Sequence, residues 1–161
     1  MFELARTANA ARIPLRVKAF HHVHMRFTPL LSILKAALKE MPTRPVVLVH
    51  GCLHEGVQAF KPTIDALAAT HAALKIHYRY SEPAPADVTR DSSSSTGFVN
   101  AELLESLVPD RNADYYFCGP KPFMVNIYHQ LLGWGIPASQ VHFEFFGPRQ
   151  ELAESPSEHA A

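Results

Sequence analysis

Two short segments near the C-terminus carry side chains suited to redox chemistry. Each is an aromatic, strand-like run that stops at Gly-Pro. The first delivers the thiol of Cys118, and the second delivers the carboxylate of Glu144 and the ring of Phe146. Because ligands bind at the carboxyl ends of the strands in parallel α/β sheets, these groups are expected at one edge of a sheet. A thiol, a carboxylate and a flat ring at that edge suggest chemistry on a flat redox cofactor.

Each of these side chains also has an ordinary structural interpretation. Cysteine and phenylalanine are common in protein cores, so Cys118 and Phe146 alone are compatible with simple packing. A glutamate such as Glu144 is usually solvated. His50 ends a strand at the same edge. It can be either a structural histidine with its hydrogen bonds satisfied or a residue that contacts the ligand.

The elements that position these segments alternate along the chain. Apolar runs bounded by turn residues predict strands near 13–20, 46–50, 74–80, 115–118 and 141–145. Helical spacing predicts helices near 29–39, 59–69, 101–107 and 121–132, with Thr28 and Asn100 as N-caps. The segment 83–96, rich in Pro, Asp and Ser, predicts a loop. This alternation predicts an α/β fold: a doubly wound, mostly parallel five-stranded sheet with helices on both faces.

The composition of the 161-residue chain indicates one globular domain with no strong charge. Fifteen basic residues balance fifteen acidic ones, so neither nucleic acid nor an acidic membrane surface is an expected partner. No apolar run approaches the roughly 20 residues that span a bilayer. The two cysteines, Cys52 and Cys118, are too few for a disulfide framework, so a reducing cytoplasm is the expected location.

Two groups of imidazole and thiolate side chains raise the question of a zinc site. They are His21, His22 and His24, and His50, Cys52 and His54. These residue types suit zinc, but their spacing matches no recognised ligand pattern, and the sheet is expected to separate the two groups. No metal site is therefore predicted.

Five segments, in their order along the chain, resemble the ferredoxin–NADP reductase superfamily, and most closely the C-terminal NAD(P)H-binding domain of flavohaemoglobins, the nitric oxide dioxygenases. They are residues 28–34, 46–50, 78–83, 116–120 and 144–148. The likeness divides the chain into a divergent N-terminal segment (1–27), an NAD(P)H-binding reductase domain (28–148) and a tail expected to be disordered (149–161). It implies hydride transfer from NAD(P)H to FAD, and in full-length relatives onward electron transfer to haem for nitric oxide dioxygenation.

The resemblance also implies roles for individual residues. Cys118 matches the cysteine beside the nicotinamide, Phe146 the aromatic ring that covers the flavin, and Glu144 the acidic residue near the flavin edge; these are the implied catalytic residues. The implied nucleotide-binding residues are Thr28, Pro29, His50, Arg79, Ser81, Gly119, Pro120 and Phe123. Of these, Arg79 and Ser81 match the region that meets the adenosine ribose and any 2′-phosphate, so either NADH or NADPH is compatible with the sequence.

The chain also departs from the family pattern. Relatives carry a Gly-x-Gly-x-Thr-Pro turn that cradles the pyrophosphate, and alignment on Thr28 and Pro29 puts His24 and Arg26 at the two glycine positions. If that turn needs positive φ, each replacement costs about 1–2 kcal/mol. The stretch 1–27 as a whole resembles a frameshifted or replaced N-terminus.

The family's flavin-binding Arg-x-Tyr-Ser motif is missing from this sequence, and there is no room for the flavin barrel or for a globin. The expected cofactors are NAD(P)H and an FAD held in a domain absent from this chain, and the expected partners are the dinucleotide and an FAD-domain or globin chain. The alternative is a truncated, non-catalytic remnant with impaired nucleotide binding.

Overall fold

The structure, a computed structural model, describes residues 15–20, 24–85, 93–109 and 111–143, with side chains at 28 and from 30 onward. Its elements, in chain order, are β1 Leu15–Phe20, α1 His24–Glu40, β2 Val46–Cys52, η1 Glu55–Val57, α2 Lys61–Thr70, β3 Leu74–Tyr80, β4 Ser94–Thr96, α3 Ala101–Leu107, β5 Asp114–Cys118, α4 Lys121–Gly133, η2 Ala138–Gln140 and β6 Val141–Phe143.

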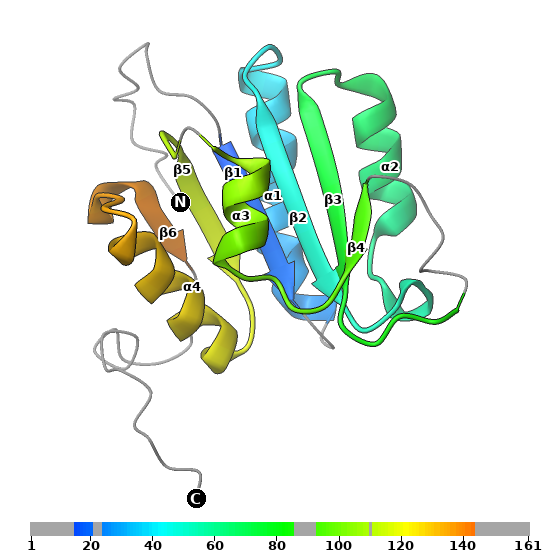
Figure 1. Ribbon diagram of the computed structural model, residues 1–161. Coiled ribbons are helices and arrows are strands. Elements are labelled where there is room, and N and C mark those ends of the chain that lie inside the picture. The colour runs from blue at the N-terminus through cyan, green and yellow to red at the C-terminus, as the bar shows by residue number, and fades with distance from the viewer. Residues whose placement is uncertain (1–14, 21–23, 86–92, 110, 144–161) are drawn as a thin grey trace, which may run out of the picture.

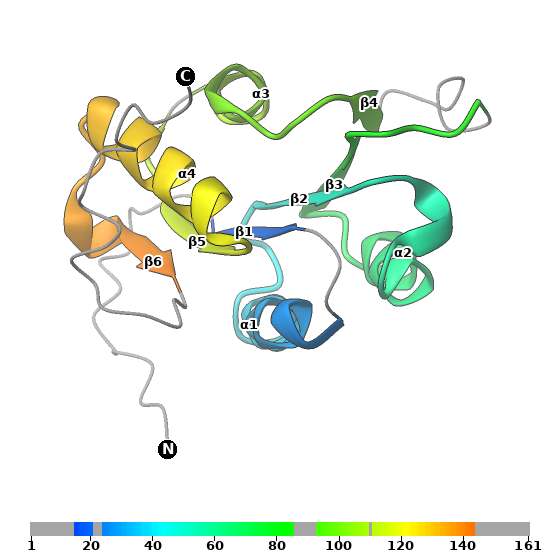
Figure 2. The ribbon, with the colours of Figure 1, turned by 90° about the horizontal axis from the view of Figure 1, so that it is seen from below.

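The six described strands form one sheet in the order β4-β3-β2-β1-β5-β6 (Figure 1). Every neighbouring pair is parallel. Helices α1 and α2 cover one face, and α3 and α4 cover the other (Figure 2). The predicted doubly wound α/β fold is therefore confirmed. The order of the strands reverses between β1 and β5, which makes that pair the switch point of the sheet.

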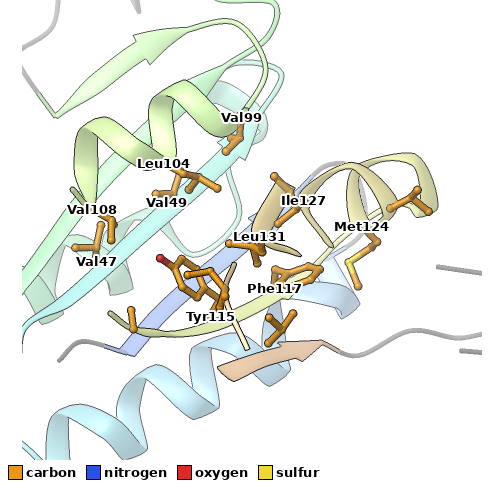
Figure 3. Packing of buried hydrophobic residues seen from close by; sticks show 14 residues of the cluster. Val47, Val49, Val99, Leu104, Val108, Tyr115, Phe117, Met124, Ile127 and Leu131 are labelled. Carbon is orange, nitrogen blue, oxygen red and sulfur yellow. The ribbon is translucent and has the colours of Figure 1, made fainter. Parts of the chain in front are cut away.

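Two apolar cores lie on opposite faces of the sheet, and β2 contributes to both. Leu48 and Cys52 face the core beneath α1 and α2, whereas Val47 and Val49 face the core beneath α3 and α4. In the second core, Phe117 of β5 packs near Val49 and the side chains of α4 (Figure 3). All seven residues of β2 are buried, as expected of a central parallel strand.

The sheet has one strand more than the five predicted, because β4 forms within the segment expected to be a loop. The N–H of Tyr78 donates to the carbonyl of Ser93 (2.8 Å), and the N–H of Gly97 donates to the carbonyl of Tyr80 (2.7 Å). These bonds satisfy backbone groups along the outer edge of β3. A three-residue edge strand built from serine and threonine carries no apolar alternation, so its sequence gave no strand signal.

Helix α1 begins at His24, five residues before the predicted first residue, so Thr28 is not its N-cap. Thr28 instead lies inside the helix, where its carbonyl accepts a hydrogen bond from Ser32 Oγ (3.0 Å). The Thr-Pro signal misled the prediction because proline is favoured at a helix start, whereas Pro29 lies inside α1, a position where a proline removes one backbone donor and its ring crowds the carbonyl four residues earlier. The other predicted cap is confirmed: Asn100 Oδ1 accepts a hydrogen bond from the N–H of Leu103 (3.1 Å).

Candidate functional site

The candidate site lies at the carboxyl edge of the sheet, at the switch point between β1 and β5. Strand β5 ends at Cys118, and two residues, Gly119 and Pro120, connect it to α4, which starts at Lys121. Pro120 is the N-cap residue, with an extended backbone, and its carbonyl accepts a hydrogen bond from the N–H of Met124 (3.0 Å). The positive end of the α4 dipole thus lies at the edge where parallel sheets bind ligands.

The thiol of Cys118 is held in a row of residues that crosses the centre of the sheet. Ala19 of β1 pairs with Cys118 on one side and with His50 of β2 on the other. At ordinary strand spacing, the Cα atoms of Cys118 and His50 lie about 10 Å apart. The side chain of Cys118 is only 2% exposed and packs in the core beneath α1. The row therefore brings thiol and imidazole to the same face of the sheet.

His50 belongs to a buried polar chain that sequence reasoning missed. The side-chain amide of Gln58 lies 3.3 Å from His50 Nδ1, and the hydroxyl of Tyr80 donates to Gln58 Oε1 (2.9 Å). Burial lowers the pKa of His50 to about 4, so the ring is neutral at pH 7. Since the Gln58 amide group donates to Nδ1, the ring proton is on Nε2. The sequence predicted the strand that ends at Tyr80, but the bond from Tyr80 to Gln58 spans 22 residues and has no local signal.

Strand β3 contributes two of the predicted residues at its carboxyl end. The backbone N–H of Ser81 donates to the carbonyl of Cys52 (3.0 Å), and among the described residues its buried Oγ has no hydrogen-bond partner. Arg79 donates from Nε to the carbonyl of Phe98 (3.1 Å) and from Nη1 to Ser95 Oγ (2.7 Å). Among the described residues, Ser81 thus has an unsatisfied hydroxyl at this edge, whereas Arg79 is engaged by Ser95 of β4 and by Phe98, two residues beyond β4.

The remaining predicted residues divide into three groups. Phe123 lies half-buried in the first turn of α4, next to the Gly-Pro turn. Thr28 is exposed on α1, and Pro29 lies within the same helix. Glu144 and Phe146 lie outside the described residues, so their implied roles beside the flavin remain predictions.

The part of the chain that the structure describes contains neither a metal-binding cluster nor a membrane-spanning helix. Within it, no group of three or more His, Cys, Asp or Glu side chains is arranged to hold a metal ion. No helix in the same residues is both long and apolar enough to cross a membrane. Cys52 and Cys118 are both buried, and neither forms a disulfide.

A parallel sheet whose order reverses beside a Gly-Pro turn and a helix N-terminus defines a nucleotide-binding α/β domain. The family described as "Oxidoreductase NAD-binding domain" matches residues 26–129. The chain belongs to this family, and the predicted resemblance is confirmed.

Curated relatives extend the match to full-length proteins. The chain is 37% identical over 131 residues to a flavohemoprotein of Halalkalibacterium halodurans, covering 80% of this chain and 31% of that protein. It is 40% identical over 126 residues to a flavohemoprotein of Burkholderia sp., covering 78% of this chain and 31% of that protein. The chain therefore spans about a third of the length of these relatives.

Solved structures share the fold. The FAD/NAD-binding domain of nitric oxide dioxygenase from Vibrio cholerae superposes with a TM-score of 0.68 at 23% identity, covering 88% of this chain and 54% of that chain. Amycolatopsis cytochrome P450 reductase GcoB superposes with a TM-score of 0.69 at 20% identity, covering 84% and 38%. At these identities the likeness shows the fold alone.

Proposed function

We propose that this chain is the NAD(P)H-binding module of an FAD-dependent oxidoreductase, and that it presents the nicotinamide ring to a flavin held by another domain or chain. The observation that carries the proposal is the turn Cys118-Gly119-Pro120 at the switch point, in a chain of the oxidoreductase NAD-binding family. A bound nicotinamide would supply the hydride and the flavin would accept it. The role of the chain is then to bind and orient the donor ring.

The described residues fit a dinucleotide at this edge. The buried Gly119 has no side chain to keep a ligand from the backbone, and the N-terminus of α4 favours anionic or carbonyl groups. The unsatisfied Oγ of Ser81 suits a hydroxyl group of the ligand, since a buried polar atom is normally hydrogen-bonded. Cys118 is the residue that we expect to lie against the nicotinamide.

A second part of the proposal concerns the electron acceptors beyond the nicotinamide, and it is based on the activity of the relatives. We infer that the natural electron path runs from NAD(P)H to FAD and then to a haem, as in nitric oxide dioxygenation by flavohaemoglobins. The flavin-binding and globin parts would come from an additional domain or a partner chain. The two buried cysteines that form no disulfide favour a reducing compartment such as the cytoplasm.

Calorimetric titration with NADH and with NADPH tests the binding step directly. The nucleotide's own fluorescence is a second signal, whereas Trp134 is a poor reporter because it caps the far end of α4. We expect saturable binding of at least one nucleotide. Absence of binding at millimolar concentrations of both would overturn the proposal.

The role of Cys118 has a matched control in Cys52, which is also a buried cysteine at a strand end on the same face. With a separately supplied FAD domain, Cys118→Ala should slow hydride transfer about tenfold or more, while changing the nucleotide Kd by a smaller factor. Cys52→Ala, which leaves a comparable cavity, should leave the hydride-transfer rate near that of the parent. Equal effects of the two substitutions would assign Cys118 a structural role only.

A second candidate function is a non-catalytic remnant that keeps the fold but has lost its phosphate cradle. The observation that favours it is the position of His24 and Arg26 in helix α1, where relatives are expected to have a glycine turn. The two candidates differ in nucleotide affinity, which the titration above measures. Replacing both residues by glycine separates them further: a remnant should pass from no detectable binding to measurable binding, whereas an active module should bind both before and after the substitution.

A further inference from the structure

Three side chains on the α3 face of the sheet form a hydrogen-bonded relay that joins β3 to the edge strand β4. Ser95 Oγ lies 2.7 Å from Arg79 Nη1 and 2.7 Å from His77 Nε2. Arg79 and Ser95 are also direct partners in the parallel register of the two strands. Figure 1 shows β4 along the outer edge of β3, with its connection running on to α3.

The direction of this relay follows from the chemistry of its members. A guanidinium group has no acceptor, so Ser95 must accept a hydrogen bond from Arg79. The Ser95 hydroxyl donates to His77 Nε2 if the ring carries its proton on Nδ1, and accepts a second hydrogen bond from Nε2 if the proton is there. Burial and the neighbouring charge of Arg79 both lower the pKa of His77, in agreement with a neutral ring. In either tautomer of His77, Ser95 links the imidazole to the guanidinium group of Arg79.

The relay also fixes the turn that follows β4. Arg79 Nε donates to the carbonyl of Phe98 (3.1 Å). Gly97 has φ +106°, and a Cβ added there would lie 2.9 Å from Arg79 Nη2, so the guanidinium lies directly against the glycine backbone. The N–H of Gly97 in turn donates to the carbonyl of Tyr80 (2.7 Å). All three nitrogens of the Arg79 guanidinium thus face β4 or the turn.

This turn presents an exposed ring at the edge of the sheet where ligands bind. Phe98 is 72% exposed, although its backbone is held by Arg79 and its neighbour Val99 is buried in the core. Because Thr96 pairs with Tyr80, the turn lies level with Ser81 at the carboxyl end of β3. The fixed backbone of the turn therefore holds this ring where it can pack against a ligand bound at the carboxyl edge of the sheet.

We propose that Arg79 is a positioning residue and does not bind phosphate: with Ser95 and His77 it holds the Gly97–Phe98 turn, and Phe98 contacts the bound dinucleotide. The inference rests on the proposed nucleotide-binding function. It differs from the role implied by the family resemblance, in which Arg79 meets the adenosine ribose and any 2′-phosphate. The two roles make opposite predictions about nucleotide selectivity, because only a phosphate-binding arginine discriminates NADPH from NADH.

The first test uses the protein without nucleotide and measures amide hydrogen exchange at Gly97. Ser95→Ala removes the relay hydroxyl, and Ser95→Thr retains it. We expect Ser95→Ala to speed exchange at Gly97 about threefold to tenfold, as the loss of one hydrogen bond implies, and Ser95→Thr to leave it unchanged. The amide of Ile136, which bonds to Leu131 at the opposite end of the molecule, is the internal control. Unchanged exchange at Gly97 in Ser95→Ala would overturn the positioning role, whether or not nucleotide binds.

The second test measures the Kd for NADH and for NADPH in variants of the turn. Arg79→Lys keeps the charge but cannot bridge Ser95 and Phe98, so it should raise both Kd values by the same factor, about threefold to tenfold. Phe98→Ala should raise both Kd values by a similar factor, whereas Phe98→Tyr, which keeps an aromatic ring, should leave both Kd values near those of the parent. Leu132→Ala, at an exposed apolar residue of α4, should change neither.

The outcomes separate this inference from the function on which it rests. A loss confined to NADPH in Arg79→Lys would show phosphate recognition and overturn the inference, while the proposed function would stand. Unchanged Kd values in Phe98→Ala would overturn the contact assigned to that ring. If the parent chain binds neither nucleotide, the proposed function and the Phe98 contact both fail, and exchange at Gly97 still decides whether Arg79 holds the turn.

Discussion

Two strand-to-helix junctions flank the switch point, and they differ in how closely they follow the pattern of the family. At the β5–α4 junction the strand ends at Cys118, and the helix begins three residues later, after a Gly-Pro turn. At the β1–α1 junction the helix begins at His24. The predicted first helical residue was Pro29, so α1 reaches roughly 7 Å further toward the edge of the sheet than expected.

The difference shows that one junction keeps the sequence pattern expected of the family, while the other departs from that pattern. Residues 24 and 26 adopt helical backbone in place of a glycine turn, so they do not carry the positive-φ strain that the sequence suggested. Among the described residues, the non-glycine positions with positive φ are Phe60 and Arg111. Any effect of these two replacements is therefore expected in ligand binding and not as positive-φ strain in the fold.

The prediction with the largest expected effect tests whether packing in the core beneath α3 and α4 holds the β5–α4 junction in place. Met124, in the first turn of α4, is fully buried in the core beneath α3 and α4. Met124→Ala should lower the free energy of unfolding by about 2–5 kcal/mol, because a cavity replaces the side chain. Urea denaturation measures this change.

The matched control for this prediction is Leu132→Ala, on the same helix but 40% exposed. It should change the free energy of unfolding by about 0.5 kcal/mol or less. Similar effects of the two substitutions would mean that α4 is not anchored through its first turn, and that the junction is held by the Gly-Pro backbone alone.

The next effect concerns His50, which pairs with Ala19 near the end of β1 and so borders the rebuilt junction. Burial lowers the pKa of His50 to about 4, whereas the unfolded chain has the ordinary value near 6.5. The unfolded state binds more protons between these two values, so stability is complete above about pH 6.5 and falls as the pH drops toward 4. The loss amounts to roughly 3 kcal/mol at the lower limit.

This contribution is isolated by comparing the parent with His50→Gln, which is polar but does not titrate. The pKa of His77 is also lowered by burial and by Arg79, so some loss of stability in acid should remain in the variant. The difference between the two curves of unfolding free energy against pH should appear between pH 4 and 6.5. Parallel curves over that range would show that His50 is not buried as a neutral ring.

The sequence predicted those parts of the fold and site that depend on local patterns. Alternating strands and helices gave the α/β class, and Asn100 marked the start of α3 because its side chain caps a backbone donor three residues away. The Cys118-Gly119-Pro120 turn was also recognisable, since a strand that ends in Gly-Pro before a helix is a local signal. These features need no knowledge of distant contacts.

The features that were missed depend on distant partners. Strand β4 exists because β3 offers unpaired backbone groups, and a run of serines gives no sign of that. The bond between Tyr80 and Gln58 and the relay from Arg79 to Ser95 join residues more than a dozen positions apart. The start of α1 was misplaced because a Thr-Pro pair is typical of a helix start, and no local pattern shows that the helix continues five residues before Pro29.

The smallest expected effect tests the comparison between the two junctions most directly. The double substitution His24→Gly and Arg26→Gly should shorten α1, because glycine destabilises a helix by about 1 kcal/mol per residue relative to alanine. The freed segment can then adopt the turn expected in relatives. We expect nucleotide affinity to rise about tenfold, equivalent to about 1.4 kcal/mol, as measured by calorimetry with NADH and NADPH.

The control for this gain is the double substitution His24→Ala and Arg26→Ala, which removes the same side chains but keeps the helix. If backbone freedom limits binding, only the glycine variant gains affinity; if bulk at these positions limits it, both variants gain. Circular dichroism should show lower helix content in the glycine variant alone. No gain in either variant would mean that the β1–α1 junction does not limit binding, and the β5–α4 junction would then account for whatever affinity the chain has.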